Sequence, residues 1–297
     1  MEVNSAQTAL SEVGRLVRVA VKHARDAFVD EQTIAAQWQA LNFLSAPDLG
    51  AAVDEFERFV DILRSSGADV QFLPRDPETT LDSIYTRDAS IVSPQGLILA
   101  RMGKPARHGE PGAQERAFHA LGRTPISGRI TPHGLLEGGD VIWLDQRTIV
   151  IGLGYRTNRE GINQVRELVG PGVDVVEVPL PHWNGERDVM HLMSLISPVD
   201  RHIAVVYSRL LPVPFRQLLL DRGYRLVDVP DDEFVSMGCN VLALAPRRCV
   251  MLSGNPGTRT ALERAGVEVI EYAGNEISVK GSGGPTCLTR PLVREAI

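Results

Sequence analysis

One pattern recurs along the 297 residues and limits what the chain can fold into: an amphipathic helix ends at a glycine, and a short apolar strand follows at once. In DEFERFVDILRSSG, four apolar residues recur at helical spacing, Val53, Phe56, Val60 and Leu63. Glycine suits a helix end because it adopts the left-handed backbone conformation without strain. The five helix-ending glycines are Gly67, Gly122, Gly170, Gly223 and Gly266. Their spacing of roughly 50 residues is typical of repeat arrays and propellers.

Apolar pairs that predict β-hairpins stand between these segments, around the turns SPQ, DQR, PVDR and PRR. The repeating unit is therefore hairpin, helix, strand. One such unit cannot bury its own apolar face, so the units must pack on their neighbours. We expect one closed α/β domain over residues 14–297, in which the run RLVRVAVK completes the last unit beside CLTRPLV, and a loose tail over residues 1–13.

Composition excludes several classes of partner. The net charge of −6 and the pI near 5.7 disfavour nucleic acid and anionic membranes. We find no apolar stretch near the roughly 18 residues that a membrane helix needs. Three cysteines are too few for a disulfide framework, so we expect free thiols in a reducing cytoplasm.

Four charged or polar residues interrupt segments that otherwise predict apolar strands: Asp88, Glu137, Asp140 and His191. A buried carboxylate without a partner is costly, so each of these acids needs a counter-ion or a cationic ligand. Each residue also has a simpler interpretation. Asp140 could cap a turn, and a single histidine at a strand start is more often structural than catalytic.

Cys287 stands in KGSGGPTCLTRPL, where small residues precede it. Such residues let a backbone approach a ligand closely and leave its amides free to donate. The alternative is an inert core thiol, which is how we interpret Cys239 and Cys249 within their apolar strands. Composition alone does not separate the two interpretations of Cys287.

The combination of these residues favours catalysis. A cysteine and a histidine suffice for covalent catalysis, and carboxylates beside them suit a flat guanidinium, whose N–H groups match carboxylate oxygens. The residues alone therefore suggest a thiol enzyme that acts on a guanidine or amidine. The sequence has no Cys-x-x-Cys, no His-x-x-x-His and no phosphate-binding loop, so we expect neither a metal nor another cofactor.

The ordered motifs YTRD, LEGGD, GYRTN, HLMS and GGPTC resemble the guanidino-group-modifying enzymes of the pentein superfamily, over roughly residues 15–293. These are the dimethylarginine dimethylaminohydrolases, arginine deiminases, arginine dihydrolases and amidinotransferases. The resemblance implies the pentein fold, a five-bladed α/β propeller of five ββαβ-type units around a central active site.

The resemblance also implies roles for individual residues. Cys287 matches the nucleophile and His191 the general acid and base. Asp88 and Glu137 match the carboxylates that bind the guanidinium. The residues implied for the amino-acid end of the substrate are Asp82 for the amino group and Arg101 and Arg156 for the carboxylate. Either arginine could instead form a surface ion pair.

Two positions depart from the subgroup patterns. Arg87 stands where dimethylargininases have a glutamate, whereas arginine deiminases share TRD. Met193 replaces the aspartate that follows the catalytic histidine by two residues in arginine deiminases. The features of the two subgroups are therefore mixed.

The resemblance implies a cysteine hydrolase of arginine or N-methylated arginine. An S-alkylthiouronium intermediate would lead to citrulline plus ammonia or (di)methylamine. The alternatives are an ornithine-forming arginine dihydrolase, an amidinotransferase and a non-catalytic scaffold. The expected partner is a small arginine-like guanidino compound. The sequence leaves open whether the chain forms a homo-oligomer.

Overall fold

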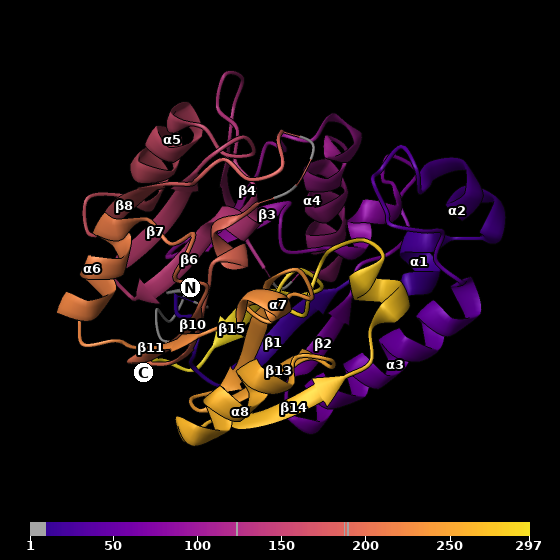
Figure 1. Cartoon of the computed structure of the whole chain (residues 1–297). Helices are drawn as coiled ribbons and strands as arrows, with labels where there is room; N and C mark the ends of the chain where they lie inside the picture. The colour runs from indigo at the N-terminus through magenta and orange to yellow at the C-terminus, as the bar shows by residue number, and fades with distance from the viewer. Residues whose placement is uncertain (1–9, 123, 187, 189) are drawn as a thin grey trace.

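The protein forms five three-stranded sheets in a computed structural model that describes residues 10–122, 124–186, 188 and 190–297. The long helices lie on the outside of the sheets (Figure 1). This is the predicted five-bladed α/β propeller. The five predicted helix-ending glycines all have positive φ, between 64° and 89°.

Every sheet has the same order, an antiparallel pair followed by a third strand that runs parallel to the second. A helix connects the second strand to the third, so the predicted unit of hairpin, helix and strand is confirmed. The strands of the four units that are continuous in sequence are β3 (Ser90–Ser93), β4 (Gly96–Leu99), β5 (Ile126–Arg129); β6 (Val141–Asp145), β7 (Thr148–Leu153), β8 (Asp174–Pro179); β9 (Ile196–Asp200), β10 (Ile203–Val206), β11 (Arg225–Asp228); and β12 (Val241–Ala245), β13 (Arg248–Leu252), β14 (Glu268–Tyr272).

The helices include one long connection in each unit and several short turns between units. The α-helices are α1 (Ala24–Phe28), α2 (Glu31–Gln37), α3 (Leu49–Ser65), α4 (Glu110–Leu121), α5 (Arg159–Val169), α6 (Val213–Asp221), α7 (Asp231–Phe234) and α8 (Pro256–Arg264). The shorter turns are η2 (Leu81–Ile84), η3 (Pro105–Arg107), η4 (Gly138–Asp140), η5 (Leu192–Ser194) and the π-turn η6 (Asn275–Val279).

Both ends of the chain build the fifth unit. Strand β1 (Leu16–Val21) pairs antiparallel with β15 (Arg290–Arg294) and parallel with β2 (Asp69–Phe72). The expected pairing of RLVRVAVK with CLTRPLV is thus confirmed, and Figure 1 shows the indigo and yellow strands together. Because this pairing joins the last unit to the first, we propose that residues 14–297 fold as a single domain.

The N-terminal segment differs in part from the expected loose tail. Residues 1–9 lie outside the described residues. Ser11 and Val13, however, are buried, and Glu12 forms an ion pair of 2.8 Å with Arg87, so the tail prediction is wrong for residues 10–13. Arg290 and Arg294 are buried near the same pair. Buried arginine charges without a carboxylate are strongly destabilising, which explains why Glu12 packs against the fold here.

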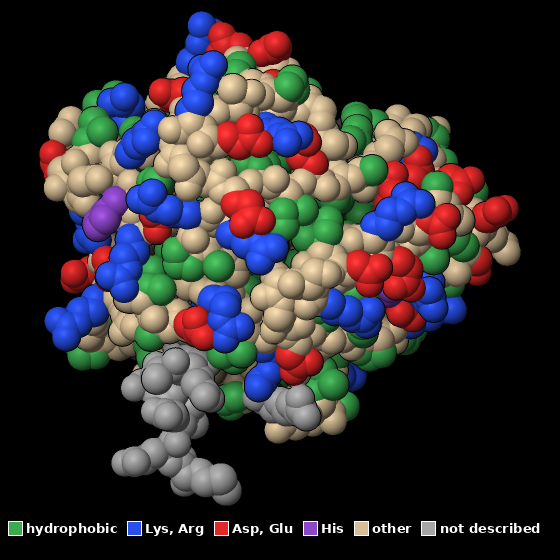
Figure 2. Space-filling model, turned by 90° about the horizontal axis from the view of Figure 1, so that it is seen from below, with side chains coloured by type: hydrophobic (Ala, Val, Ile, Leu, Met, Phe, Trp, Pro, Cys, Tyr) green, Lys and Arg blue, Asp and Glu red, His purple; other side chains and the backbone are tan. Residues whose placement is uncertain are grey.

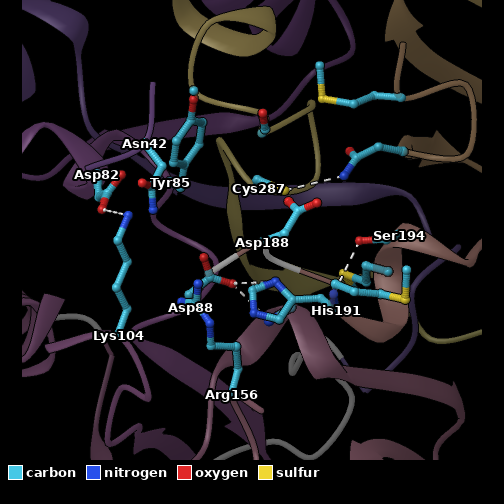
Figure 3. A pocket seen from close by; sticks show the side chains of 18 of the residues that line it. Asn42, Asp82, Tyr85, Asp88, Lys104, Arg156, Asp188, His191, Ser194 and Cys287 are labelled. Carbon is cyan, nitrogen blue, oxygen red and sulfur yellow. Dashed lines mark hydrogen bonds and ion pairs between the residues drawn. The ribbon is translucent and has the colours of Figure 1, made fainter. Parts of the chain in front are cut away.

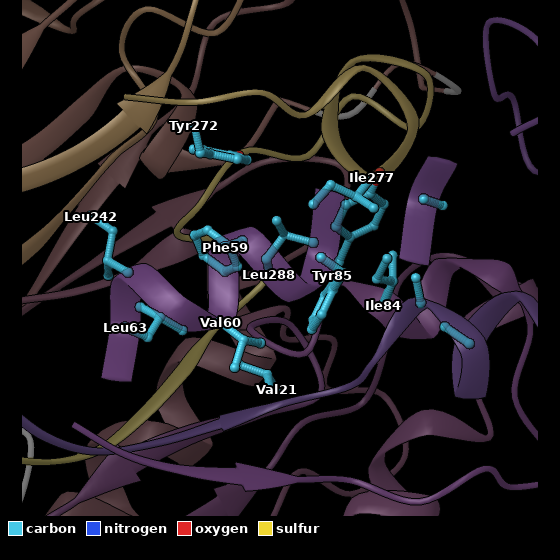
Figure 4. Close-up of a cluster of buried hydrophobic side chains, with 14 of the residues drawn as sticks. Val21, Phe59, Val60, Leu63, Ile84, Tyr85, Leu242, Tyr272, Ile277 and Leu288 are labelled. Carbon is cyan, nitrogen blue, oxygen red and sulfur yellow. The ribbon is translucent and has the colours of Figure 1, made fainter. Parts of the chain in front are cut away.

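Helix α3 packs the largest apolar cluster against the C-terminal part of the chain (Figure 4). It begins at Leu49, earlier than expected, where Asp48 caps it by accepting a hydrogen bond of 2.8 Å from the Ala51 N–H. Its buried face consists of Ala52, Phe56, Phe59, Val60 and Leu63, whereas Val53 is only half-buried. The same cluster includes Tyr85 and Leu288, so this core reaches the residue that follows Cys287.

The polar residues that interrupt apolar segments were expected inside strands. The structure places them in the turns that lead into the strands. Asp88 precedes β3. Glu137 precedes η4, the turn before β6, and Asp140 is the last residue of that turn. His191 precedes η5 and β9. Asn240 and Cys287 stand in the equivalent places before β12 and β15. Turns leave backbone N–H groups unpaired, so they can hold buried acceptors that a strand could not. Each of the five units therefore contributes its entry turn to one region.

The surface carries both signs of charge. On the face seen in Figure 2, lysine and arginine side chains are interspersed with aspartate and glutamate. Among the described residues, no helix has the length and apolar character needed to cross a membrane.

We expect Glu12→Gln to lower the free energy of unfolding by about 3 kcal/mol at neutral pH, because it leaves buried arginine charges uncompensated. Urea unfolding would measure this. The matched control is Glu295→Gln, which breaks an exposed pair with Arg15 and should have little effect. Equal losses from the two variants would contradict the assignment.

The contribution of Glu12 should also depend on pH. Burial alone would raise the pKa of Glu12, but Arg87 and Arg294 lower it below its ordinary value. The pair therefore stabilises the fold at neutral pH, and this contribution is lost as the pH falls through the lowered pKa. The unfolding free energies of the wild type and Glu12→Gln should converge in acid.

Candidate active site

A cavity of about 240 Å³ lies where the entry turns of the units meet. Five of the seven residues predicted from sequence line it: Asp82, Asp88, Arg156, His191 and Cys287. Figure 3 shows Cys287, Asp88 and His191 gathered together, with the Asp82–Lys104 pair to one side. The structure therefore brings together residues that are more than 200 positions apart in the sequence.

Cys287 is half-buried, whereas Cys239 and Cys249 are fully buried. The Asn240 side-chain amide donates a hydrogen bond of 3.3 Å to the Cys287 Sγ, and its oxygen accepts one of 3.0 Å from the Thr286 N–H. Burial, and then the charge of Asp88, raises the pKa of the Cys287 thiol, while the donor from Asn240 opposes this rise. The thiol is therefore protonated at neutral pH when the cavity holds no cation.

The glycines before Cys287 serve packing as well as access. A Cβ atom on Gly283 would lie 2.2 Å from the Tyr85 ring, and one on Gly284 would lie 2.5 Å from the Asn240 side-chain oxygen. The sequence analysis assigned these small residues to close approach of a ligand. The structure shows that they also let the loop approach Tyr85 and Asn240.

His191 is held by Glu137. Its Nε2 lies 2.8 Å from a Glu137 oxygen, and its Nδ1 lies 3.8 Å from Asp88. Burial alone would lower the pKa of His191, but the charges of Asp88 and Asp140 and the hydrogen bond that the ring donates to Glu137 raise it to about 9. The ring is therefore an imidazolium at neutral pH, which makes it a proton donor.

Asp88 faces both His191 and a buried arginine. One oxygen accepts a hydrogen bond of 3.0 Å from the Gly139 N–H, and the other lies 2.6 Å from Arg107. A Cβ atom on Gly139 would lie 2.3 Å from the His191 ring, so only glycine permits this approach. The LEGGD motif thus supplies a small residue where Asp88 and His191 meet.

Asp140, whose role the sequence left open, supports the turn that carries His191. It is fully buried, and it accepts a hydrogen bond of 2.9 Å from the Leu192 N–H. Burial raises the pKa of Asp140 to about 6. Its interaction is that of a turn cap, as the simpler interpretation held.

Two of the residues predicted for the amino-acid end of a substrate, Asp82 and Arg156, line the cavity. Asp82 forms an ion pair of 2.6 Å with Lys104. Arg156 is buried and lines the cavity, with its Nη1 lying 3.4 Å from Glu137. The pairing of Asp82 with a lysine of the same chain was not expected.

Glu137 does not occupy the expected place. It is fully buried behind His191 and does not line the cavity. One oxygen accepts hydrogen bonds from the N–H groups of Gly103 and Lys104, and the other bonds to His191. Burial alone would raise the pKa of Glu137, but His191 and Arg156 lower it. The geometry therefore contradicts its prediction as a direct guanidinium ligand.

Arg101 and Arg87 also lie elsewhere. Arg101 donates to the Gly134 carbonyl at 3.2 Å and lines a different cavity beside β4, so it does not face Cys287. Arg87 is turned away from the site toward Glu12. It therefore does not line this cavity, whereas Met193 does.

The polar lining residues that sequence reasoning missed include Lys104, Arg107, Asp188 and Asn240. Lys104 and Arg107 belong to GKPAR, directly after the strand that the analysis assigned to Arg101. Charged residues just past a buried strand were the available signal. Asp188 and Asn240 precede His191 and β12, where the entry turns of the other units already carry polar residues.

Asp88, Glu137 and His191 also form a cluster in which one ligand atom from each lies within 4.8 Å of the others. A metal ion would compete there with the existing contacts of Glu137 to His191 and of Asp88 to Arg107. A divalent ion beside the Arg107 guanidinium would also meet charge repulsion. The expectation that the enzyme needs no metal remains a prediction.

Comparison with known proteins agrees with this arrangement. The family model described as N,N dimethylarginine dimethylhydrolase, eukaryotic, matches residues 47–294. The uncharacterized protein YkgA of Bacillus subtilis is 32% identical over 82% of this chain and 80% of its own length. The N(G),N(G)-dimethylarginine dimethylaminohydrolase of Streptomyces coelicolor is 29% identical over 82% of this chain and 86% of its own. The structure of a Pseudomonas aeruginosa DDAH complexed with citrulline has a TM-score of 0.74 at 21% identity, covering 94% and 99% of the two chains.

The charge state of His191 can be tested directly. In a ring-nitrogen NMR titration we expect His191 to titrate near pH 9 and His23, whose pKa burial lowers, to titrate below its ordinary value in the same spectra. Glu137→Gln should move the His191 transition toward neutrality, because it removes the bonded carboxylate. A wild-type His191 that titrates at or below 6.5 would contradict the assignment.

Proposed function

Because the chain belongs to the N,N dimethylarginine dimethylhydrolase family and is an amidine-hydrolysing enzyme, we propose that it hydrolyses the guanidino group of an arginine-type compound through a covalent bond to Cys287. With arginine or an N-methylated arginine, the products would be citrulline plus ammonia or (di)methylamine. One observation carries the proposal: a half-buried thiol, an imidazolium and a carboxylate line one cavity.

In the first half-reaction, Asp88 binds the guanidinium beside Cys287. The substrate cation offsets the burial and the Asp88 charge that keep the thiol protonated, so the thiol can ionise, with its proton released to solvent. The thiolate attacks the guanidinium carbon and forms a C–S bond. His191 gives its proton to the departing nitrogen, and the C–N bond breaks. Cys287 then carries an S-alkylthiouronium, and His191 is neutral.

In the second half-reaction, water attacks the same carbon and gives a proton to the neutral His191. The C–S bond breaks and releases the Cys287 thiolate. The hydroxyl group on the product carbon then gives its proton to this thiolate. The product is a urea, and the imidazolium is restored. Glu137 acts as a positioning residue, because it accepts a hydrogen bond from His191 and stabilises the imidazolium that donates a proton.

The surroundings of Sγ support this assignment. The Asn240 amide donates to Sγ, which favours the thiolate as attacking and leaving group. All three cysteines are free thiols, which suits a reducing cytoplasm. Cys239 and Cys249 have a pKa raised by burial, so neither competes as a nucleophile.

A pair of small reagents tests the cationic pocket without any amino-acid head group. We expect 2-chloroacetamidine to alkylate Cys287 and the neutral 2-chloroacetamide to react more than ten times more slowly, because only the amidinium is bound by Asp88. Peptide mass spectrometry would locate the adduct. Equal rates for the two reagents, or an adduct mainly on Cys239 or Cys249, would overturn the proposal.

Turnover provides the second test. Cys287→Ala should abolish release of the ureido product from ¹³C-guanidino-labelled arginine, whereas Cys249→Ala, a buried thiol in β13, should retain most activity. Mass spectrometry would follow the label. Label in citrulline supports hydrolysis, label in carbon dioxide with ornithine indicates a dihydrolase, and activity in Cys287→Ala excludes the covalent mechanism.

A further inference from the structure

The head-group end of the cavity already contains a cation of the chain itself. The Lys104 Nζ lies 2.6 Å from an Asp82 oxygen and donates a hydrogen bond of 2.8 Å to the Leu41 carbonyl. Both side chains are mostly buried, at 18% exposure for Lys104 and 6% for Asp82. Figure 3 shows this pair on the side of Asp88 away from His191 and Cys287.

A carboxylate beside a carbonyl oxygen is the acceptor set that a substrate ammonium group would need. Here the Lys104 Nζ occupies the space between these two groups, with a hydrogen bond to the Leu41 carbonyl and an ion pair with Asp82. A substrate with an α-ammonium would have to displace the lysine or lie beside it, and two like charges at such a distance repel each other strongly where water is scarce. The backbone of Lys104 is held by the bond from its N–H to Glu137, so the residue cannot move away as a whole.

The remaining carboxylates of the cavity do not provide a second ammonium site at this end. Among the described lining residues, the acids other than Asp82 are Asp88 and Asp188. Asp88 lies beside His191, at the reacting end. The Arg107 that pairs with it is shared with Glu110, so that this arginine does not neutralise Asp88 alone as Lys104 does Asp82. Figure 3 places Asp188 near Cys287, away from Asp82.

The cavity also offers groups for an anion. The Arg156 side chain contacts Glu137 through Nη1, at the long distance of 3.4 Å. Lys104 has three donors, of which the hydrogen bond to the Leu41 carbonyl uses one. A carboxylate that enters here would meet one lysine and one arginine, with the Asp82 charge already neutralised.

We propose that the preferred substrate is an ω-guanidino carboxylic acid without a free α-ammonium group, and that Lys104 determines this specificity. The inference rests on the proposed hydrolysis at Cys287 and narrows its substrate class. The guanidinium binds at Asp88, and the carboxylate binds at Arg156 and Lys104. Arginine and its N-methylated forms are then weaker substrates, because each brings a second positive charge to Lys104.

Three compounds that differ only in the head group test this inference. They are 5-guanidinopentanoate, which has the arginine chain without the α-ammonium, L-arginine, and agmatine, which lacks the carboxylate. For the wild type we expect kcat/KM for 5-guanidinopentanoate to exceed that for arginine at least tenfold, and agmatine to be turned over more slowly than 5-guanidinopentanoate. A wild type that prefers arginine would overturn the inference, and this comparison needs no variant.

Lys104→Met should reverse the preference, because it frees Asp82 for an ammonium group and removes a charge from the carboxylate site. The ratio of kcat/KM for 5-guanidinopentanoate to that for arginine should fall at least tenfold. The matched control is Lys280→Met, since Lys280 also pairs with a carboxylate, at 2.7 Å, and with a carbonyl, at 3.0 Å, but does not line the cavity. An unchanged ratio in folded Lys104→Met would refute the role of Lys104.

The chloroacetamidine reaction separates failure of this inference from failure of the proposed function. The reagent has no head group, so its preference for Cys287 does not depend on Lys104. Selective labelling together with a preference for arginine would leave the hydrolase in place and remove only the narrowed substrate class. Loss of selective labelling and of all guanidine hydrolysis would remove the proposed function itself.

Discussion

The buried carboxylate of Glu137 is the interaction on which the site depends. One oxygen accepts from the N–H groups of Gly103 and Lys104, which follow β4, and the other bonds to His191, which precedes β9. Arg156, after β7, adds its charge to the first oxygen. A single fully buried group therefore joins three units of the propeller. Its negative charge is stable only because these donors surround it, and the donors are positioned because the charge is there.

The same carboxylate links the two ends of the cavity. Through His191 it maintains a proton donor beside Cys287, and through the backbone of Lys104 it holds the lysine that neutralises Asp82. The proposed chemistry and the proposed head-group recognition thus depend on one carboxylate. This arrangement explains why a residue that does not line the cavity can matter to both.

Closure of the ring supplies the other half of the site. Cys287 precedes β15, which belongs to the same sheet as β1, so the proposed nucleophile takes its position through the pairing of the two ends of the chain. Glu12, which pairs with Arg87 beside the same strands, neutralises part of the arginine charge that this closure buries. The stability of the fifth unit and the position of the thiol are therefore connected.

The repeat of helix, glycine and strand could be predicted from the sequence because helix ends and apolar periodicity are local properties. This repeat predicted the five-unit fold and the pairing of the terminal strands. The residue types of the site could also be predicted, since a buried polar residue within an apolar segment requires a partner. The sequence did not predict which of these residues face the cavity. Glu137 and Arg101 turn away from it, and Lys104 enters it, because side-chain direction depends on contacts between turns of different units. Those contacts are long-range in sequence, so only the folded chain sets which charge meets which, and with it the head group that the cavity can accept.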